Sequence, residues 1–265
     1  MKYFDKAIHF FRELVNSLWV RAMCALVALG TMVSLAESYY AHTRTQAVAI
    51  NIRGQAGFHF VEQRGIKDKL QNHLPAALHQ YTLNELPLAD LEDMLEHKPH
   101  VAGAEVYMDV AGKLLAHVRQ REPTVRIINN EQESFYLDKQ GKRMPFSPAY
   151  EKPLVTASGA IKASATGDLS DSEAQTLEAI QRVSQHIRQD SFLRALTGQV
   201  YIAPNQDIQL IPRIGEQTIV LGQAQNLPDR FNKLKAFYQK VLPSKGWYTY
   251  ERINLKYEKQ IVAKK

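Results

Sequence analysis

The sequence predicts an α+β protein with a single N-terminal transmembrane helix, a small strand-helix-helix-strand-strand domain and a larger β-rich domain with two or more helices. Three observations lead to this prediction. One long apolar stretch occurs, near the N-terminus. Two helical patterns then lie between a strand and a hairpin, and a series of short strands with two further helical patterns follows. These patterns place the segment boundaries at residues 1–17, 18–40, 41–128 and 129–265.

The apolar stretch from Leu18 to Tyr40 is long enough to cross a membrane as a helix. Its uncharged part, Ala22–Ala36, would rise only about 22 Å, so the helix must use the flanking residues to span a hydrocarbon core of about 30 Å. Trp19 at one end and tyrosines at the other suit the aromatic belts of a membrane. Arg21 can extend its guanidinium to the headgroups. We therefore expect a membrane anchor.

A cleaved signal peptide is the alternative interpretation of this stretch, because Ser34-Leu35-Ala36 resembles a small-residue cleavage pattern. The segment before the apolar core is longer than a usual charged leader, which favours the anchor. That segment also has apolar residues at helical spacing, which predicts a short interfacial helix. These residues are Phe4, Ile8, Phe11, Val15 and Leu18.

The charges beside the apolar stretch favour a cytoplasmic N-terminus. Four basic residues precede or begin it, namely Lys2, Lys6, Arg12 and Arg21. No second long apolar run follows, so residues 1–17 are expected to form a cytoplasmic tail and the rest of the chain to lie outside the cytoplasm. The single cysteine, Cys24, falls within the stretch, so an intrachain disulfide is excluded.

The domain over residues 41–128 is predicted from five elements in sequence order. They are a strand over Gln46–Gly54, a helix over Gly65–His73, a second helix that begins after Pro87 and ends before Pro99, and a hairpin of Ala104–Val110 with Leu114–Val118. In each strand the apolar residues alternate with polar ones, and in each helix they recur three or four residues apart.

The domain over residues 129–265 is predicted to be rich in short strands. A hairpin is indicated by Ser134–Leu137 and Arg143–Phe146 around a turn that ends in Gly141. Further strands are expected at Leu154–Ala157, Val200–Ala203, Ile208–Ile214 and Gln217–Leu221, and one or two within Trp247–Val262. Helices are expected over Asp171–Phe192, opened by a capping box of Ser170 and Glu173, and over Asp229–Val241.

Composition and motifs argue against nucleic-acid binding and catalysis. The net charge is +6, but the basic residues are scattered, whereas nucleic-acid binders concentrate them. Prolines separate the histidine pairs His73/His79 and His97/His100, and Glu131 with Glu133 is best explained as surface charge. No metalloprotease, serine-hydrolase or phosphate-loop motif occurs in the sequence. We expect no enzyme, no cofactor, no metal site and no small-molecule substrate.

Three segments give the chain a resemblance to the FtsQ/DivIB family of bitopic bacterial division proteins, and it covers nearly the whole chain. Val118–Val125 (VRQREPTV) is similar to the "ERxPVA" strand that ends the family's POTRA unit. Phe135–Arg143 (FYLDKQGKR) is similar to its "YLVDxxGxVF" hairpin, and Tyr250–Tyr257 (YERINLKY) to its terminal "YxxIDLRY" strand. Asn254 and Lys256 depart from that last pattern, in which the family has Asp and usually Arg.

The resemblance implies a POTRA-like domain at residues 41–128 and an FtsQ-type β domain at residues 129–265. It also implies recruitment of other division proteins: FtsB-like and FtsL-like partners would be held outside the membrane, linking early and late division proteins for septal peptidoglycan synthesis. It places the chain in the cell inner membrane as a single-pass protein with a periplasmic bulk, enriched at the division site. A membrane-anchored POTRA-containing subunit of a transport or secretion machine is the alternative.

The resemblance places partner binding near the last strand, because an unpaired strand edge can be completed by a partner segment. The candidate residues carried over by position are Trp247, Lys256, Tyr257, Glu258 and Lys259. Tyr257 is the strongest candidate, since aromatic residues are favoured at interface hot spots. The plain alternative is that Tyr257 packs in the sheet and the lysines keep its edge soluble.

A second candidate surface lies on the POTRA-like unit. It comprises the first strand around Val48–Arg53 and the acidic helix Asp90–Glu96. For the acidic helix, the sequence favours a simpler interpretation as a solvated helix face.

Overall fold

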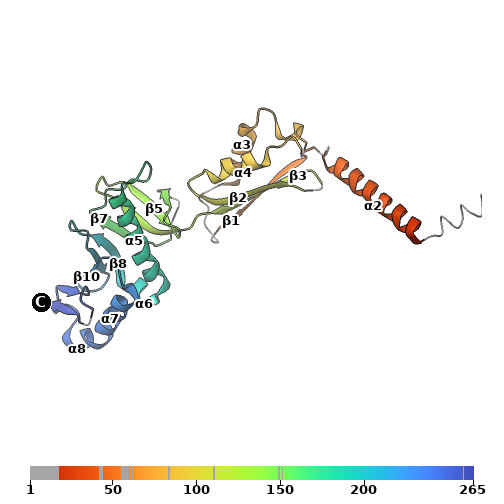
Figure 1. Ribbon diagram of the computed structural model, residues 1–265. Helices are drawn as coiled ribbons and strands as arrows, with labels where there is room; N and C mark the ends of the chain where they lie inside the picture. The colour runs from red at the N-terminus through yellow and green to blue at the C-terminus, as the bar shows by residue number, and fades with distance from the viewer. Residues whose placement is uncertain are drawn as a thin grey trace, which may run out of the picture. The chain divides into compact units, whose positions relative to one another are not determined.

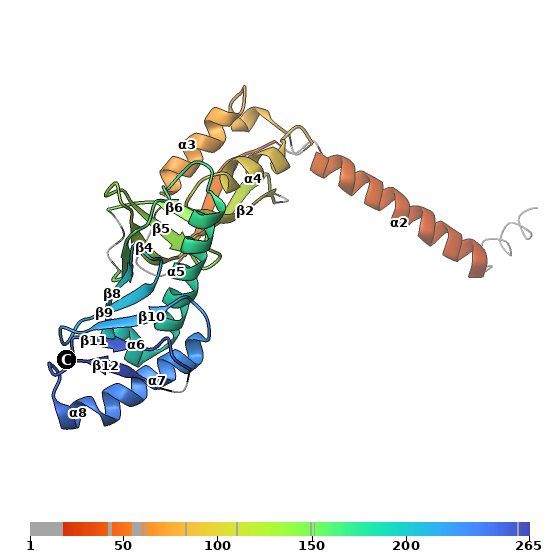
Figure 2. The same cartoon turned by 60° about the vertical axis from the view of Figure 1, so that its left-hand side comes forward.

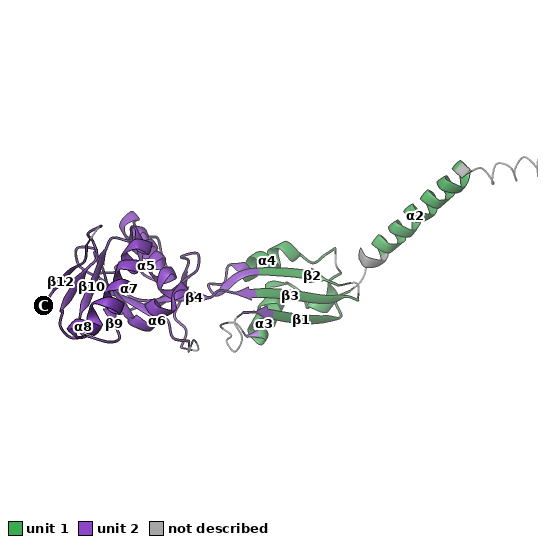
Figure 3. Ribbon diagram, turned by 90° about the horizontal axis from the view of Figure 1, so that it is seen from below, with its two compact units in different colours: residues 1–51, 63–95, 104–118 green, residues 52–62, 96–103, 119–265 purple. Residues whose placement is uncertain are grey.

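The computed structural model describes residues 18–265 apart from residues 42–43, 55–59, 61, 83, 110, 149, 151 and 259 (Figure 1). The interfacial helix predicted within residues 4–18 therefore lies almost wholly outside the described residues, and so does Lys259. The chain forms two compact units (Figure 3). The first comprises residues 1–51, 63–95 and 104–118, and the second comprises residues 52–62, 96–103 and 119–265.

The predicted N-terminal apolar helix is present as α2 (Leu18–Ala41). Within it, Trp19–Ser38 is long and apolar enough to cross a membrane by length and composition, and none of this segment is buried by the rest of the described chain. Large apolar side chains such as Trp19 and Leu35 are exposed, at 86% and 72%. A helix that is apolar all round and covered by no protein suits a lipid environment.

The predicted β-α-α-β-β order is confirmed, and most of it lies in the first unit; residues 52–53, 96, 101–103 and 119–120 of these elements are assigned to the second unit. A three-stranded sheet has the order β1-β3-β2, and two helices with a short 3-10 turn between them lie over one of its faces (Figure 1). The elements are β1 (Ala47–Arg53), α3 (Gln63–His73), η1 (Leu78–Gln80), α4 (Leu88–Glu96), β2 (Val101–Met108) and β3 (Lys113–Gln120). The helices contribute Ile66, Leu70, Leu91 and Leu95 to the core, and the strands contribute Val106, Leu114, Ala116 and Val118.

The second unit is built on a nine-stranded sheet with the order β12-β11-β10-β9-β8-β7-β4-β5-β6. The strands are β4 (Pro123–Ile128), β5 (Ser134–Asp138), β6 (Arg143–Pro145), β7 (Val155–Gly159), β8 (Thr197–Ile202), β9 (Ile208–Pro212), β10 (Thr218–Gly222), β11 (Arg252–Asn254) and β12 (Val262–Lys264). The pairs β4·β7, β7·β8 and β10·β11 are parallel, and the remaining pairs are antiparallel.

Helices connect the last two of these parallel pairs, as parallel pairing requires a crossover. α5 (Asp171–Gln189) and α6 (Ser191–Leu196) join β7 to β8, whereas α7 (Leu227–Lys240) and α8 (Leu242–Lys245) join β10 to β11. The long helices α5 and α7 lie over one face of the sheet (Figure 2) and bury their apolar residues there with those of the strands. Among the described residues, no helix covers the opposite face.

Local sequence explains where α5 begins and ends. The capping box predicted at its start is present, because Ser170 accepts a hydrogen bond from the Glu173 N–H and Glu173 binds the Ser170 N–H in return. The helix predicted to run to Phe192 ends at Gln189. Asp190 is extended, and its Oδ1 accepts from the Leu193 N–H at 3.0 Å, so this carboxylate begins a separate helix, α6.

Strand β4 was not anticipated as an element of the larger sheet. Its residues 123–128 lie at the end of the domain that was expected to span residues 41–128. They nevertheless pair with β5 on one side and with β7 on the other. Val125 and Ile127 are fully buried against the helices. The strand therefore lies inside the nine-stranded sheet, because it contributes to that sheet's core and hydrogen-bond ladder.

Candidate functional site

The described edge of the nine-stranded sheet at the C-terminal end is β12. β11 is an inner strand, since it pairs in parallel with β10, with Ile219 opposite Ile253, and antiparallel with β12, with Ile253 opposite Ala263. Within the described residues β12 pairs with β11 alone and ends the strand order. The terminal strand expected within Tyr250–Tyr257 is thus not the edge; the edge strand begins at Val262, eight residues after the last residue of β11.

The structure brings three of the five predicted site residues onto one loop. Lys256, Tyr257 and Glu258 lie in the connection between β11 and β12 and not in a strand, and their side chains are exposed. Trp247 lies in the turn after α8, before β11. Lys259 is outside the described residues, so the structure gives no position for it.

Lys233 on α7 holds this loop in place. Its ammonium group donates hydrogen bonds to the backbone carbonyls of Leu255 (3.4 Å), Glu258 (3.2 Å) and Tyr257. Lys256 makes one backbone and one side-chain contact. Its backbone N–H donates to Asn254 Oδ1 at 3.0 Å, and its Nζ forms an ion pair with Asp207 Oδ2 at 3.0 Å. The loop that leads into the edge strand is therefore ordered by charged hydrogen bonds.

Exposed aromatic and apolar side chains gather in the segments around β11 and β12. Trp247 is 41% exposed, Tyr248 74%, Tyr257 50% and Val262 43%. Such residues, when grouped on a surface, mark interaction sites more often than isolated exposed residues do. Sequence analysis found Trp247 and Tyr257 but missed Tyr248 and Val262; the Trp-Tyr pair in the sequence was a signal that could have found Tyr248.

The indole of Trp247 rests on Tyr238, with ring centroids 6.0 Å apart. Tyr238 is buried, and its hydroxyl accepts a 2.7 Å hydrogen bond from Gln217 Nε2. Burial raises the pKa of Tyr238 to about 12, and the bond from Gln217 acts in the opposite direction. Tyr238 therefore stays neutral at ordinary pH and provides a fixed apolar support for the exposed Trp247.

The second predicted surface has a partly structural role. Glu92 of α4 accepts a 2.6 Å hydrogen bond from the Val106 N–H of β2, so its carboxylate links the helix to the sheet. Asp90, Asp93 and Glu96 are exposed. β1 is one edge of the three-stranded sheet. The acidic helix thus combines one internal contact with the solvated face expected from the sequence.

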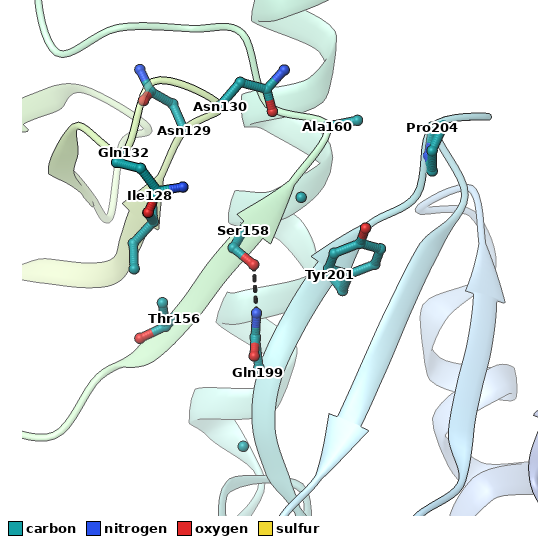
Figure 4. Close-up of a pocket in the computed structure, with 12 residues that line it drawn as sticks. Ile128, Asn129, Asn130, Gln132, Thr156, Ser158, Ala160, Gln199, Tyr201 and Pro204 are labelled. Atoms are coloured by element: carbon teal, nitrogen blue, oxygen red, sulfur yellow. Dashed lines mark hydrogen bonds between the residues drawn. The ribbon is translucent and has the colours of Figure 1, made fainter.

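A polar hollow of about 800 Å³ lies on the helix-free face of the larger sheet, over β4, β7 and β8 (Figure 4). Amides and hydroxyls line it, and Ser158 Oγ accepts a hydrogen bond from Gln199 Nε2. The described lining contains no His, Cys, Asp, Glu or Lys. The hydrogen-bond partner of Ser158 is therefore a side-chain amide. A serine nucleophile is activated by a hydrogen bond to a general base instead.

The described residues can also be compared with the side-chain clusters that hold metal ions. Within the described part of the chain, no three His, Cys, Asp or Glu side chains come together as a metal site would require. His97 and His100, three residues apart in the sequence, have different surroundings: His97 is exposed, whereas His100 is stacked on Phe60 with ring centroids 4.7 Å apart. Burial, and then the charge of Arg121, lower the pKa of His100.

Comparison with known proteins separates the chain into the same two kinds of domain. A family model for POTRA-like domains matches residues 43–119, and a family model described as FtsQ/DivIB, C-terminal related, matches residues 122–264. The cell division protein FtsQ of Salinibacter ruber is 29% identical over 160 residues, which are 58% of this chain. The chain spans about 60% of the length of that relative.

These matches support a role in cell division. The apolar helix α2, together with the similarity to FtsQ, suggests a single-pass membrane protein of the division machinery. The C-terminal family model covers more than half of the chain and includes the whole nine-stranded sheet with its open edge. The chain belongs to the FtsQ/DivIB family, a family of non-enzymatic cell division proteins.

Proposed function

We propose that this protein holds FtsB-like and FtsL-like division proteins outside the cytoplasmic membrane and thereby links early to late division proteins for septal peptidoglycan synthesis. The observation that carries the proposal is the open edge of β12, together with the exposed side chains of Trp247, Tyr248 and Tyr257 in the segments that precede β11 and β12, in a chain of the FtsQ/DivIB family. α2 would anchor the protein in the inner membrane, with a cytoplasmic N-terminus and a periplasmic bulk enriched at the division site.

Strand addition explains how such an edge would bind a partner. An edge strand presents N–H and C=O groups that have no partner in the sheet, and an extended segment of another chain can pair with them. The partner would become a tenth strand beside β12. Main-chain hydrogen bonds would supply affinity, and side-chain contacts with neighbouring aromatic residues would supply specificity.

The proposed contact residues are Trp247, Lys256, Tyr257, Glu258 and Lys259, which come before β11 or between β11 and β12 in the sequence. Trp247 and Tyr257 would serve as the apolar anchors, because each exposes a large part of its ring. Lys256 and Glu258 carry opposite charges on the same exposed loop and would orient a partner at the rim of the interface. Lys259 is retained on the resemblance alone.

Binding without catalysis is the mode of action that we propose for this chain. Its support is the family assignment together with the chemistry of the described hollow on the sheet, where amides and hydroxyls predominate. A partner segment that pairs with a strand edge requires no activated nucleophile, no cofactor and no metal.

A binding titration tests the proposal. The full-length protein in non-ionic detergent is titrated with the outer segment of the same organism's FtsB-like protein, alone and with its FtsL-like partner. We expect saturable binding that Tyr257→Ala and Trp247→Ala each weaken about tenfold or more. Tyr107→Ala is the matched control, because Tyr107 is a 44% exposed tyrosine on the POTRA-like unit.

Two outcomes would count against the proposal. Equal losses in Tyr107→Ala and Tyr257→Ala would move the interface away from the C-terminal edge. An absence of binding by well-folded protein, together with normal septa in cells depleted of it, would favour a transport or secretion role. Depletion should instead give elongated cells without septa.

A further inference from the structure

A basic hollow of about 710 Å³ lies at the β5 end of the second unit and is separate from the proposed partner edge. In the strand order β5 and β12 lie towards opposite ends of the sheet. Four cationic side chains line the hollow, from Arg53, Arg119, Arg121 and Lys139, against one acidic residue, Glu122. All of these residues belong to the second unit.

Two of the four cations are neutralised within the chain. Arg121 Nη1 contacts Asp138 Oδ2 at 2.8 Å, and Lys139 Nζ contacts Glu122 Oε2 at 2.6 Å. Arg53 and Arg119 are exposed, and among the described residues neither forms an ion pair or a side-chain hydrogen bond. Among the described residues, Arg53 and Arg119 are therefore the two lining cations that have no ion-pair partner.

Arg121, one of the residues that line this hollow, also has an unused donor. Its side chain is only 10% exposed, and its buried Nε has no hydrogen-bond acceptor in the described structure. A buried unpaired donor on a charged group is costly and calls for an explanation. The amide oxygen of the neighbouring Gln120 accepts from the Phe60 N–H at 2.7 Å.

The guanidinium of Arg121 is held in a fixed position. Asp138, its partner, is itself fixed, because its Oδ1 accepts hydrogen bonds from the Gln140 N–H (2.9 Å) and the Lys142 N–H (2.8 Å). Arg119 lies against Gly103, where an added Cβ would come within 2.9 Å of Arg119 Nη2. The glycine leaves room for the Arg119 guanidinium, and Glu96 Oε1 lies 3.6 Å from the same added Cβ.

We propose that this hollow binds the carboxylates of an acidic peptide segment. A guanidinium presents its donors in a planar fork that matches a carboxylate, and charge-assisted bonds of this type are stronger than neutral ones. The anions that Arg121 and Lys139 already hold here are carboxylates, at 2.8 and 2.6 Å. An incoming carboxylate would pair with the exposed guanidinium groups of Arg53 and Arg119.

Fluorescence anisotropy of a labelled peptide tests the proposal on the full-length protein in non-ionic detergent. The probe is a peptide of four glutamates spaced by glycines and joined to a neutral dye, and its glutamine counterpart is the blank. Arg53→Gln combined with Arg119→Gln should weaken binding about tenfold. The matched control, Arg64→Gln with Arg194→Gln, removes two exposed arginines elsewhere and should change binding less than about twofold.

Arg121 is left unchanged in this test because its loss would leave the buried Asp138 without its ion-pair partner. Gly103→Ala provides a second variant that keeps every charge but displaces Arg119, and it should weaken binding by a smaller factor. The proposal is overturned if the glutamate peptide does not bind, if the glutamine peptide binds as well, or if both double variants lose equally. Displacement of the peptide by an equal concentration of inorganic phosphate would also overturn it.

Discussion

Lys233→Met should loosen the C-terminal edge of the sheet without unfolding the rest of the unit. The Lys233 ammonium donates to three carbonyls of the β11–β12 loop, those of Leu255, Tyr257 and Glu258. Methionine retains the length of the side chain and its contacts along α7 but removes the donors. The three carbonyls would then rely on water, and the loop would open more often.

The size of the effect follows from these contacts. Hydrogen bonds from a charged group contribute about 1.5–3 kcal/mol, and the half-buried position of Lys233 favours the lower end. A loss of about 1.5 kcal/mol corresponds to roughly tenfold more frequent local opening. The effect should be confined to β11, β12 and their loop, because the ammonium group contacts no carbonyl elsewhere in the described chain.

Amide hydrogen exchange measures this opening directly. The Leu255 N–H donates to the Val220 carbonyl and the Glu251 N–H to the Lys264 carbonyl, each at 2.9 Å, so both amides report on the edge. They should exchange about tenfold faster in Lys233→Met, whereas amides of α5 should not change. Lys240→Met, an exposed lysine on the same helix, should have less than about a twofold effect. The reasoning is refuted if Leu255 changes less than twofold, or if α5 changes equally.

Three further predictions concern backbone conformation and charge. Gly159→Ala should lower the free energy of unfolding by at least about 3 kcal/mol, because φ is +103° and an added Cβ would lie 2.2 Å from the Ile202 carbonyl oxygen; a change under about 1 kcal/mol in thermal unfolding would contradict this. Gly65→Ala, in α3 with no atom within 4 Å of the added Cβ, should instead stabilise by about 0.5–1 kcal/mol, and a lower Tm would be inconsistent with it. The hydrogen bond from Lys235 lowers the pKa of Asp190 in the folded protein. The Asp190 carboxylate therefore stabilises the fold fully above its ordinary pKa of 3.8, and this stabilisation is lost as the pH falls through the lowered pKa. Asp190→Asn keeps the helix cap. When the pH is lowered from about 7 to about 2.5, the Tm of this variant should fall less than the Tm of the wild type, and an equal fall would count against this account.

Local signals made several elements predictable. The apolar composition of α2, the Ser170–Glu173 capping box and the alternation in β2 and β3 each depend on residues close in sequence, and each is confirmed. The break at Asp190 also had a local signal, since an aspartate followed by serine suits a helix start. It was obscured by the apolar periodicity that continues into Phe192.

The candidate site depended more on long-range pairing. β11 becomes an inner strand because it pairs in parallel with β10 across the α7–α8 crossover, and three residues of strand carry little periodicity of their own. Local patterns therefore could not distinguish β11 from the edge strand β12. The contacts of Lys233 and the unpaired Nε of Arg121 likewise arise from residues far apart in sequence, so they are visible only in the folded chain.

Disulfide scanning across the edge tests the central claim most directly. The native Cys24 is replaced by serine, Val262→Cys is introduced in β12, and single cysteines are placed at successive positions of the FtsB-like segment. If that segment adds as a strand, cross-linking should peak at one register and recur at every second position, because side chains alternate between the two faces of a sheet. Equal cross-linking at consecutive positions, or none at all while binding persists, would contradict strand addition at β12.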